Sequence, residues 1–257
     1  MARLRQLALV LALPVALLAL CWLLLADSTS FYAPPLRRIL AAFGPTWAPR
    51  WASEVASSIA LLVIGYAGAV VAGVGLGIPL GARPRLRAVF EPALELFRAI
   101  PPPALVPAVK LVFGWGPATN VLVIVSGAVW PVLLNTIEGV RAIDEVLADT
   151  CRCYGITGAR RLYVLVLRAA SPQIITGMRQ ALSIAIILMV ISDMMVGSSG
   201  LGFTILEFQR GFSIPEMWSG ILLLGGLGVV LSLVFRGFEA VALRWYHGLR
   251  RPQRGDA

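Results

Sequence analysis

Ionisable side chains are scarce in this chain of 257 residues: only 14% are Asp, Glu, Lys or Arg, whereas 58% are hydrophobic and the mean hydropathy is +0.84. Soluble globular domains carry about 25% charged residues. A shortfall of this size excludes a soluble protein with an ordinary core. It predicts a protein that crosses a membrane several times.

Lysine and histidine are nearly missing, since Lys110 and His247 are the single examples. The sequence has no G-x-x-x-x-G-K-[ST] motif, the loop that cradles the phosphates in P-loop ATPases. It also offers no nucleophile beside a general base, because Ser198 and Ser199 have no acid–base partner in the sequence. We therefore expect neither enzymatic activity nor a bound cofactor on this chain, and any ATP hydrolysis has to occur on another chain.

Cysteine is also sparse, with only Cys21, Cys151 and Cys153. The C-x-C pair falls in a segment that we place in the reducing cytoplasm, and a zinc site there would need more ligands than His247 can supply. We expect no disulfide framework and no metal site. The net charge of +9 and the pI near 10.5 do not indicate nucleic-acid binding, because the arginines stand at the ends of apolar runs, where they orient membrane spans.

Six apolar runs have about the length needed to cross a hydrocarbon core of about 30 Å. The first, Leu7–Ala26, follows Arg3 and Arg5, and we favour a retained span over a cleaved signal peptide, whose apolar region would be only about 7–15 residues long. Residues 27–51 predict an external loop with a short interfacial helix. The other five spans are expected at 55–80, 93–113, 118–138, 174–196 and 217–236.

The arginines orient these spans. If the N-terminus is inside the cell, the outer loops contain only Arg37, Arg38, Arg50 and Arg210. The other arginines that flank the spans then lie on the inner side. The positive-inside rule therefore places both termini, and the polar interval at about 140–172, in the cytoplasm. We divide the chain into residues 1–54, with the first span and the external loop, a transmembrane domain at 55–250 and a cytoplasmic tail at 251–257.

A ladder of small residues runs along the second expected span. Gly73, Gly77 and Gly81 recur every four residues, and Gly75 widens the ladder. Small residues let helix backbones approach closely in lipid. We favour packing within one subunit over contact with a second copy. No internal repeat is visible, which disfavours a secondary transporter, because many of those are built from repeated halves.

The polar interval carries the most specific pattern: from Asp149 to Leu167 it runs D-T-C-R-C-Y-G-I-T-G-A-R-R-L-Y-V-L-V-L. An acidic residue is followed six positions later by Gly155 and then by alternating aliphatic residues. This resembles the cytoplasmic loop E-A-A-x-x-x-G, followed by I-x-L-P, of the permease subunits of binding-protein-dependent ABC importers. In that family the loop docks into the ATPase subunit.

Four positions depart from the family pattern. Asp149 replaces the usual Glu, Thr150 and Cys151 replace the two alanines, and Arg168 stands where the terminal proline belongs. The spacing from the glycine to the aliphatic residues is intact. We interpret the docking function as kept and the partner specificity as altered, and a degenerate subunit with weakened coupling is the alternative.

Other stretches resemble the sulfonate, taurine and nitrate importers of this family, in the same order and with preserved loop spacing between about residues 55 and 250. They are Gly77-Ile78-Pro79-Leu80-Gly81, Arg98-Ala99-Ile100-Pro101-Pro102, Ala104-Leu105-Val106-Pro107, Phe113-Gly114-Trp115-Gly116, Pro131-Val132-Leu133-Leu134-Asn135-Thr136, Thr176-Gly177-Met178-Arg179 and Ser198-Ser199-Gly200-Leu201-Gly202. Each match alone is weak, but the ordered set is specific.

The resemblance implies an all-α membrane protein with the type I ABC importer permease fold, six transmembrane helices and both termini cytoplasmic, in a bacterial cytoplasmic (inner) membrane. It also implies three kinds of partner: a second permease copy, ATPase subunits that hold ATP and Mg, and an extracytoplasmic solute-binding protein. The solute would be a small anion such as a sulfonate, taurine or nitrate. A pyrimidine-like vitamin precursor stays open, as does a heterodimer in place of a homodimer.

The docking loop needs a fixed fold and a surface that fits a groove. Gly155 suits a sharp reversal between helices, because glycine tolerates positive φ. Asp149, near the end of a helix that begins at about Ile143, could form a salt bridge or a cap. Tyr154, Ile156 and Leu162 are the expected apolar anchors and Arg160 and Arg161 the rim charges; Arg152, Leu165 and Leu167 complete the expected coupling residues. The alternative is an ordinary positively charged inner loop.

Ionisable groups inside a span cost about 2.5–3.5 kcal/mol at the helix centre, so they usually face a partner or a wet cavity. Lys110, Arg179 and Asp193 are therefore the candidates for the translocation path. We favour a pair between Lys110 and Asp193 over a Lys110 that is free to attract an anionic solute. Glu138 and Arg141 are expected to make gate or loop contacts. Two other functions remain open: a stand-alone secondary transporter or channel, and a membrane assembly subunit that does not transport.

Overall fold

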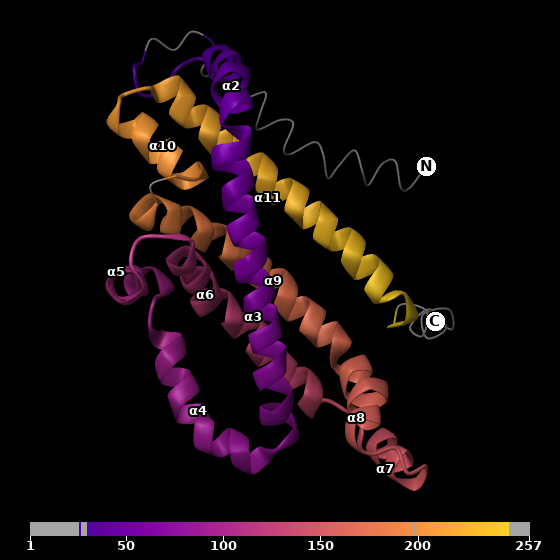
Figure 1. The fold of residues 1–257 in the computed structure, drawn as a ribbon. Helices are drawn as coiled ribbons and strands as arrows, with labels where there is room; N and C mark the ends of the chain where they lie inside the picture. Colours follow the sequence, from indigo (N-terminus) through magenta and orange to yellow (C-terminus); the bar gives the residue numbers. More distant parts are fainter. Residues whose placement is uncertain (1–25, 27–29, 198, 247–257) are drawn as a thin grey trace, which may run out of the picture.

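The computed structural model describes Ala26, residues 30–197 and residues 199–246, and all the regular structure in these residues is helical (Figure 1). In chain order the elements are α2 (Leu36–Arg50), the π-helix η1 (Trp51–Val55), α3 (Ala56–Ala82), α4 (Pro84–Ala99), α5 (Pro102–Phe113), α6 (Pro117–Arg141), α7 (Glu145–Cys153), α8 (Gly158–Arg161), the π-helix η2 (Leu162–Leu167), α9 (Arg168–Val196), α10 (Leu201–Arg210) and α11 (Ile214–Ala242).

Four helical stretches within the described residues are long and apolar enough to cross a membrane. They are Leu36–Ala82, Pro117–Arg141, Gly158–Val196 and Ile214–Ala242. Each contains one of the expected spans, at 55–80, 118–138, 174–196 and 217–236 respectively. The protein is therefore a multi-pass membrane protein. The expected first span, Leu7–Ala26, lies outside the described residues except for Ala26.

The expected span at 93–113 is not one continuous helix but a bent pair of helices. Two helices, α4 and α5, meet there at 92°. If this bent pair is counted as one span, the described residues contain five spans. The break falls at Ile100 and Pro101: the proline disfavours the helical region for the residue before it, and Ile100 has an extended ψ of 120°. The described side chains of α4 are all at least partly exposed, and this helix stands away from the rest of the bundle (Figure 1).

Within the expected loop and short helix of residues 27–51, residues 30–35 are non-helical and a helix follows them. The helix, α2, has 15 residues and continues through η1 into α3, so no loop separates it from the following span. It packs against α11 at the end of the bundle that carries α10 (Figure 1). Trp47 of α2 is buried, and its indole Nε1 donates a hydrogen bond of 2.9 Å to Ser219 Oγ of α11.

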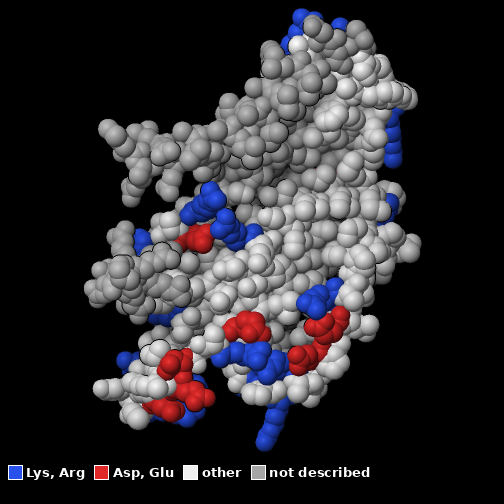
Figure 2. Space-filling view, turned by 180° about the vertical axis from the view of Figure 1, so that it is seen from behind, with Lys and Arg blue, Asp and Glu red and all other residues white. Residues whose placement is uncertain are grey.

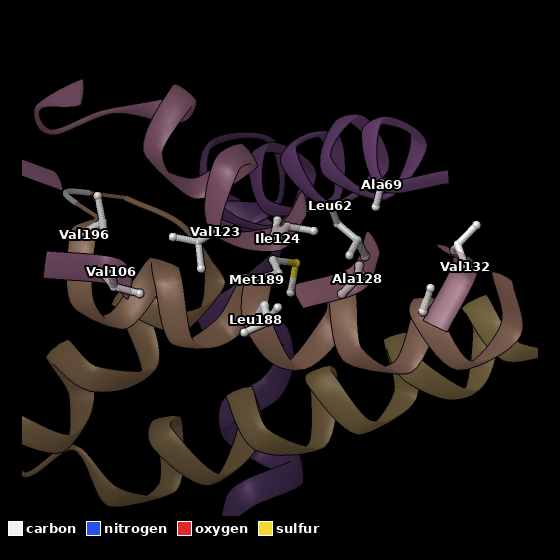
Figure 3. Packing of buried hydrophobic residues seen from close by; sticks show 12 residues of the cluster. Leu62, Ala69, Val106, Val123, Ile124, Ala128, Val132, Leu188, Met189 and Val196 are labelled. Atoms are coloured by element: carbon white, nitrogen blue, oxygen red, sulfur yellow. The ribbon is translucent and has the colours of Figure 1, made fainter. Parts of the chain in front are cut away.

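The core lies where α3, α6 and α9 pack side by side. Figure 3 shows Leu62 of α3, Ile124 of α6, and Leu188 and Met189 of α9 among the buried side chains that meet there. Short aliphatic residues such as Ala69 lie between the larger ones, so the three backbones approach closely.

The glycine ladder of α3 faces α6, which confirms packing within one subunit. A Cβ on Gly73 would lie 2.7 Å from Val132 Cβ, and one on Gly81 would lie 2.8 Å from Val140 Cβ. Gly75 has no such neighbour within 4 Å, so it is outside the contact. The ladder fixes the distance between α3 and α6.

The two ends of the bundle differ in character. Figure 1 shows α7 and α8 projecting at one end and α2 with α10 at the opposite end. In Figure 2 many of the described charged side chains gather over the lower part of the molecule, which carries α7, α8 and α4, and a smaller group of both signs lies at mid-height on the left; most of the other described surface is white. This distribution suits a protein whose middle lies in lipid and whose α7–α8 end reaches water.

Candidate coupling and translocation sites

The polar interval folds as a helical hairpin whose first arm is α7. Asp144 caps its N-terminus: the side chain accepts hydrogen bonds from the backbone N–H groups of Val146 (2.8 Å) and Leu147 (3.2 Å). Asp149 forms an ion pair of 3.0 Å with Arg152, one turn later. Both side chains of that pair are exposed, so it adds little stability, and the cap that fixes the helix is Asp144.

Gly155 makes the reversal after α7. Its φ is +67°, as expected from its position in the motif. The N–H of Ile156 donates to the carbonyl of Cys151 (2.8 Å), and the N–H of Gly155 donates to the carbonyl of Arg152 (3.0 Å). These two bonds form a Schellman motif, which satisfies the last carbonyls of a helix and requires the left-handed conformation at this residue. The hairpin is therefore set by its backbone.

The expected coupling residues divide by exposure. Tyr154 is 80% exposed and Leu162 is 39% exposed, whereas Leu165 is only 4% exposed and cannot meet a partner directly. Of the others, Asp149, Arg152, Gly155 and Arg160 are exposed, and Ile156, Arg161 and Leu167 are half-buried. Sequence reasoning missed four apolar side chains that are exposed beside them, namely Val146, Leu147, Tyr163 and Val164. Together with Tyr154 and Leu162 they form what we call the hairpin surface.

The expected pair between Lys110 and Asp193 is wrong. Lys110 Nζ donates a hydrogen bond of 3.3 Å to the carbonyl of Met195 and lies 2.9 Å from the ring centroid of Trp115. Asp193 is 1% exposed, and its carboxylate instead accepts bonds from uncharged donors. Hydrogen bonds donated to a carboxylate stabilise its charged form, so these donors take the place of a cation.

Those donors come from three different helices. Ser58 Oγ of α3 (2.6 Å), Asn120 Nδ2 of α6 (3.0 Å) and the backbone N–H of Gly202 of α10 (3.4 Å) all donate to Asp193. Ser58 Oγ also accepts from the N–H of Leu201 (2.8 Å). The network ties α9 and the start of α10 to α3 and α6.

Glu54 extends the network, since its Oε2 accepts from the N–H of Gly200 (2.6 Å). Sequence reasoning missed Glu54, Ser58 and Asn120, because each is distant in sequence from Asp193 and ordinary in its own context. A cavity of about 290 Å³ adjoins the network and is lined by Asp193 and Asn120. Asn120 Oδ1 is buried and has no hydrogen-bond partner among the described residues.

Two neighbouring serines test the importance of this network. Ser58→Ala is expected to lower the free energy of unfolding by about 1–3 kcal/mol, because it leaves the buried N–H of Leu201 without an acceptor and the carboxylate of Asp193 without one donor. Ser57→Ala is the matched control, because Ser57 Oγ only donates to carbonyls of its own helical stretch, and it should change stability by less than about 0.5 kcal/mol. Thermal unfolding in nanodiscs measures both, and equal effects would contradict the role given to Ser58.

Arg179 lies apart from this network, on α9. Its guanidinium Nη1 is 3.8 Å from Glu239 Oε2 of α11, and it lines a larger cavity of about 620 Å³ between the two helices. Glu138 and Arg141 pair with each other at 2.7 Å, one turn apart near the end of α6. The structure therefore brings none of Lys110, Arg179 and Asp193 into contact with each other.

Metal-ligating side chains do not gather in the part of the chain that the structure describes: no group of three or more His, Cys, Asp or Glu there could hold a metal ion. Cys151 is buried in α7 and Cys153 is exposed, and both are free thiols.

The chain matches a family of known proteins. Residues 69–245 match the family described as "Binding-protein-dependent transport system inner membrane component". The chain belongs to this family. Its members are the non-catalytic permease subunits of ABC transporters, and the expected resemblance is confirmed.

Two relatives within this kind of permease are similar in sequence to the chain. It is 31% identical over 176 residues to a Bacillus subtilis (strain 168) permease protein whose name assigns it to aliphatic sulfonate transport; the match covers 68% of this chain and 64% of that protein. It is 27% identical over 224 residues to the taurine transport system permease protein of Escherichia coli (strain K12), covering 85% of this chain and 82% of that protein. This chain is thus similar to permeases named for sulfonate compounds.

A solved structure has the same fold. The permease is similar to a chain of the MetNI methionine ABC transporter in an inward-facing conformation, with a TM-score of 0.61 and 20% sequence identity, over 74% of this chain and 94% of that chain. At this identity the similarity concerns the fold alone, and it confirms an all-α, type I ABC importer permease architecture.

Proposed function

We propose that this chain is the transmembrane permease subunit of an ATP-driven importer and that its hairpin couples it to a separate ATPase subunit. The observation that carries the proposal is the hairpin surface. Six apolar side chains, Tyr154 among them, are exposed at the end of the bundle that projects furthest, on a reversal fixed by the Schellman motif at Gly155. A projecting, partly apolar surface on a fixed backbone can bind in a groove of a partner and be displaced when that partner moves.

The proposed docking role also determines which side of the membrane the hairpin faces. The hairpin lies in the cytoplasm, where ATPase subunits can reach it, and the arginines of residues 140–172 fit the cytoplasmic side. Both termini are then cytoplasmic if residues 7–26 form a sixth span. A bacterial cytoplasmic (inner) membrane is the location that we assign.

The assembly would contain two permease copies, two ATPase subunits and an extracytoplasmic solute-binding protein. ATP and Mg would bind to the ATPase subunits, and this chain would carry no cofactor. Closure of the ATPases would move the two hairpins and open the pathway alternately to each side of the membrane. The family description, which names a binding-protein-dependent system, supports this set of partners.

The solute class that we assign is a small molecule or ion that carries an oxyanion group, of the sulfonate, taurine or nitrate type. The names of the two curated relatives, one for aliphatic sulfonates and one for taurine, support this class. Arg179, an exposed side chain that lines an open cavity between α9 and α11, gives the class a physical basis on this chain.

Reconstitution in liposomes tests the proposal. Radiolabelled taurine and nitrate should accumulate only when the permease, its ATPase and its binding protein are present together with ATP. Uptake by the permease alone would instead support a stand-alone transporter or channel. An assembly that binds the ATPase but moves neither taurine, nitrate nor a panel of small sulfonates would support the non-transporting subunit.

A further inference from the structure

Arg236 is a charged residue that the coupling hairpin and the buried network do not use. It is the only basic residue of α11, and the helix has no other ionisable residue between Glu216 and Arg236. Among the described residues it forms no ion pair or hydrogen bond, unlike Arg98, Arg141 and Arg152. A guanidinium on an apolar membrane helix is costly unless something satisfies it.

Arg236 and Arg179 line the same cavity of about 620 Å³ between α9 and α11. Ser183 and Ser232 are its other polar lining residues, and the remaining lining side chains are aliphatic, aromatic or glycine. Neither serine hydroxyl makes a hydrogen bond to another residue in the described part of the chain. The cavity therefore offers a ligand two hydroxyl groups, the guanidinium of Arg236, which is unpaired within the described residues, and the guanidinium of Arg179, which Glu239 also contacts.

The helix directions bring these four groups to one end of the cavity. α9 and α11 run antiparallel (Figure 1), with Arg179 opposite Glu239 and Leu182 packed in one cluster with Phe235. Ser183 follows Arg179 by one turn and Ser232 precedes Arg236 by one turn, so each hydroxyl lies on the same helix face as its guanidinium. Because the helices are antiparallel, both arginines lie nearer the hairpin end, and both serines lie one turn further into the bundle.

The charges near the cavity leave an excess of positive charge. Glu239 is the carboxylate that contacts Arg179, at 3.8 Å, and it does not line the cavity. Two guanidinium groups against one carboxylate leave one positive charge uncompensated. Guanidinium groups bind planar or tetrahedral oxyanions through paired N–H donors, and hydroxyl groups can add further donors.

We propose that this cavity binds an oxyanion between Arg179 and Arg236, supplied either by a transported solute or by the headgroup of an anionic lipid. A sulfonate, nitrate or phosphate oxygen has the chemistry that the four donors recognise. Where the oxyanion is the solute, the inference rests on the proposed function, and it places a solute contact at the hairpin end of α9 and α11.

Direct binding to the full chain in nanodiscs, co-purified with its ATPase and without ATP, tests the site. The probe is radiolabelled methanesulfonate, in discs of phosphatidylcholine alone and in discs that also contain phosphatidylglycerol. Arg236→Gln should weaken methanesulfonate binding roughly tenfold or more, the effect of losing a charge-assisted donor pair. Native mass spectrometry identifies the lipid headgroup as the source of the oxyanion if the wild type retains phosphatidylglycerol and Arg236→Gln loses it. If phosphatidylglycerol does not affect methanesulfonate binding, the solute is the source.

A second variant guards against misfolding, because it acts in the opposite direction. Glu239→Gln removes the carboxylate that competes for Arg179 and should tighten oxyanion binding about threefold, which a damaged protein would not do. Arg210→Gln, on α10 at the opposite end of the bundle, is the control and should leave binding unchanged. If neither methanesulfonate nor phosphatidylglycerol binding responds to Arg236→Gln or Glu239→Gln, the site is overturned.

The same discs separate this inference from the proposed function. If the ATPase fails to associate but oxyanion binding still depends on Arg236, the importer assignment falls and the site stands. If the complete importer accumulates solute and binding is independent of both arginines, the site falls and the importer assignment stands.

Discussion

Replacing Tyr154 with alanine is expected to weaken the binding of the ATPase subunit to this permease about 30-fold. Tyr154 is 80% exposed at the C-terminal end of α7, and it is the most exposed side chain of the hairpin surface. Truncating a tyrosine that acts as a binding hot spot costs about 2 kcal/mol or more, which corresponds to about 30-fold in the dissociation constant. The chain itself should stay as stable as the wild type, because the side chain packs against little of its own protein.

The measurement is a binding titration of the purified ATPase against the permease in nanodiscs, with ATP-driven uptake as a second readout. Tyr32→Ala is the matched control: Tyr32 is 69% exposed and lies just before α2, at the opposite end of the bundle. If the two variants bind the ATPase equally well, the hairpin surface is not where the ATPase docks.

The second large effect is expected in the contact between α3 and α6. Gly77→Val should lower the free energy of unfolding by at least about 3 kcal/mol, at the upper end of the range for overpacked cores. A Cβ on Gly77 would lie 2.6 Å from Thr136 Cβ and 3.1 Å from the backbone carbonyl oxygen of Leu133. A side-chain rotation cannot relieve either contact, so the two helices would have to separate along their length.

Gly75→Val on the same helix is the control, because nothing lies within 4 Å of a Cβ built there. Valine is also a better helix former than glycine, so this variant should be neutral or slightly more stable. Thermal unfolding in nanodiscs and the yield of monodisperse protein report both effects. Similar melting temperatures for Gly75→Val and Gly77→Val would show that the two helices do not meet at the ladder.

Local patterns predicted the elements whose chemistry is local. Gly155 was recognisable because the resemblance to the importer loop puts a glycine at this position, and glycine adopts the left-handed conformation of a sharp reversal at least cost. The ladder of Gly73, Gly77 and Gly81 was recognisable because a spacing of four residues puts small residues on one helix face. Both features are confirmed by the backbone angle and the Cβ contacts.

The bend between α4 and α5 could have been predicted but was not. We predicted one span from the hydropathy of residues 93–113, although three consecutive prolines begin at Pro101. The conformational restriction on Ile100 outweighs the continuity of the apolar residues. Hydropathy measures transfer into lipid and carries no information about backbone angles, and the backbone decided this segment.

The contacts between distant segments could not be read from local pattern. Asp193 was singled out as an ionisable residue in a span and was paired with Lys110, because opposite charges at similar depth are the simplest partners. Its real partners, Ser58 and Asn120, are neutral and lie 135 and 73 residues away in sequence. Arg236 was overlooked because it marked the end of an apolar run, where an arginine is ordinary.

The glycine ladder has a consequence for the synthesis of this protein. The chain has to grow by about 60 residues between the end of α3 at Ala82 and the end of α6 at Arg141. At a synthesis rate of roughly 5–20 residues per second, about 3–12 s pass between the completion of α3 and the completion of α6, which covers the glycine ladder. During that interval the small-residue face lies open to the membrane without its partner. The surface that later packs tightly against α6 is therefore one through which the nascent chain can mispair or be degraded.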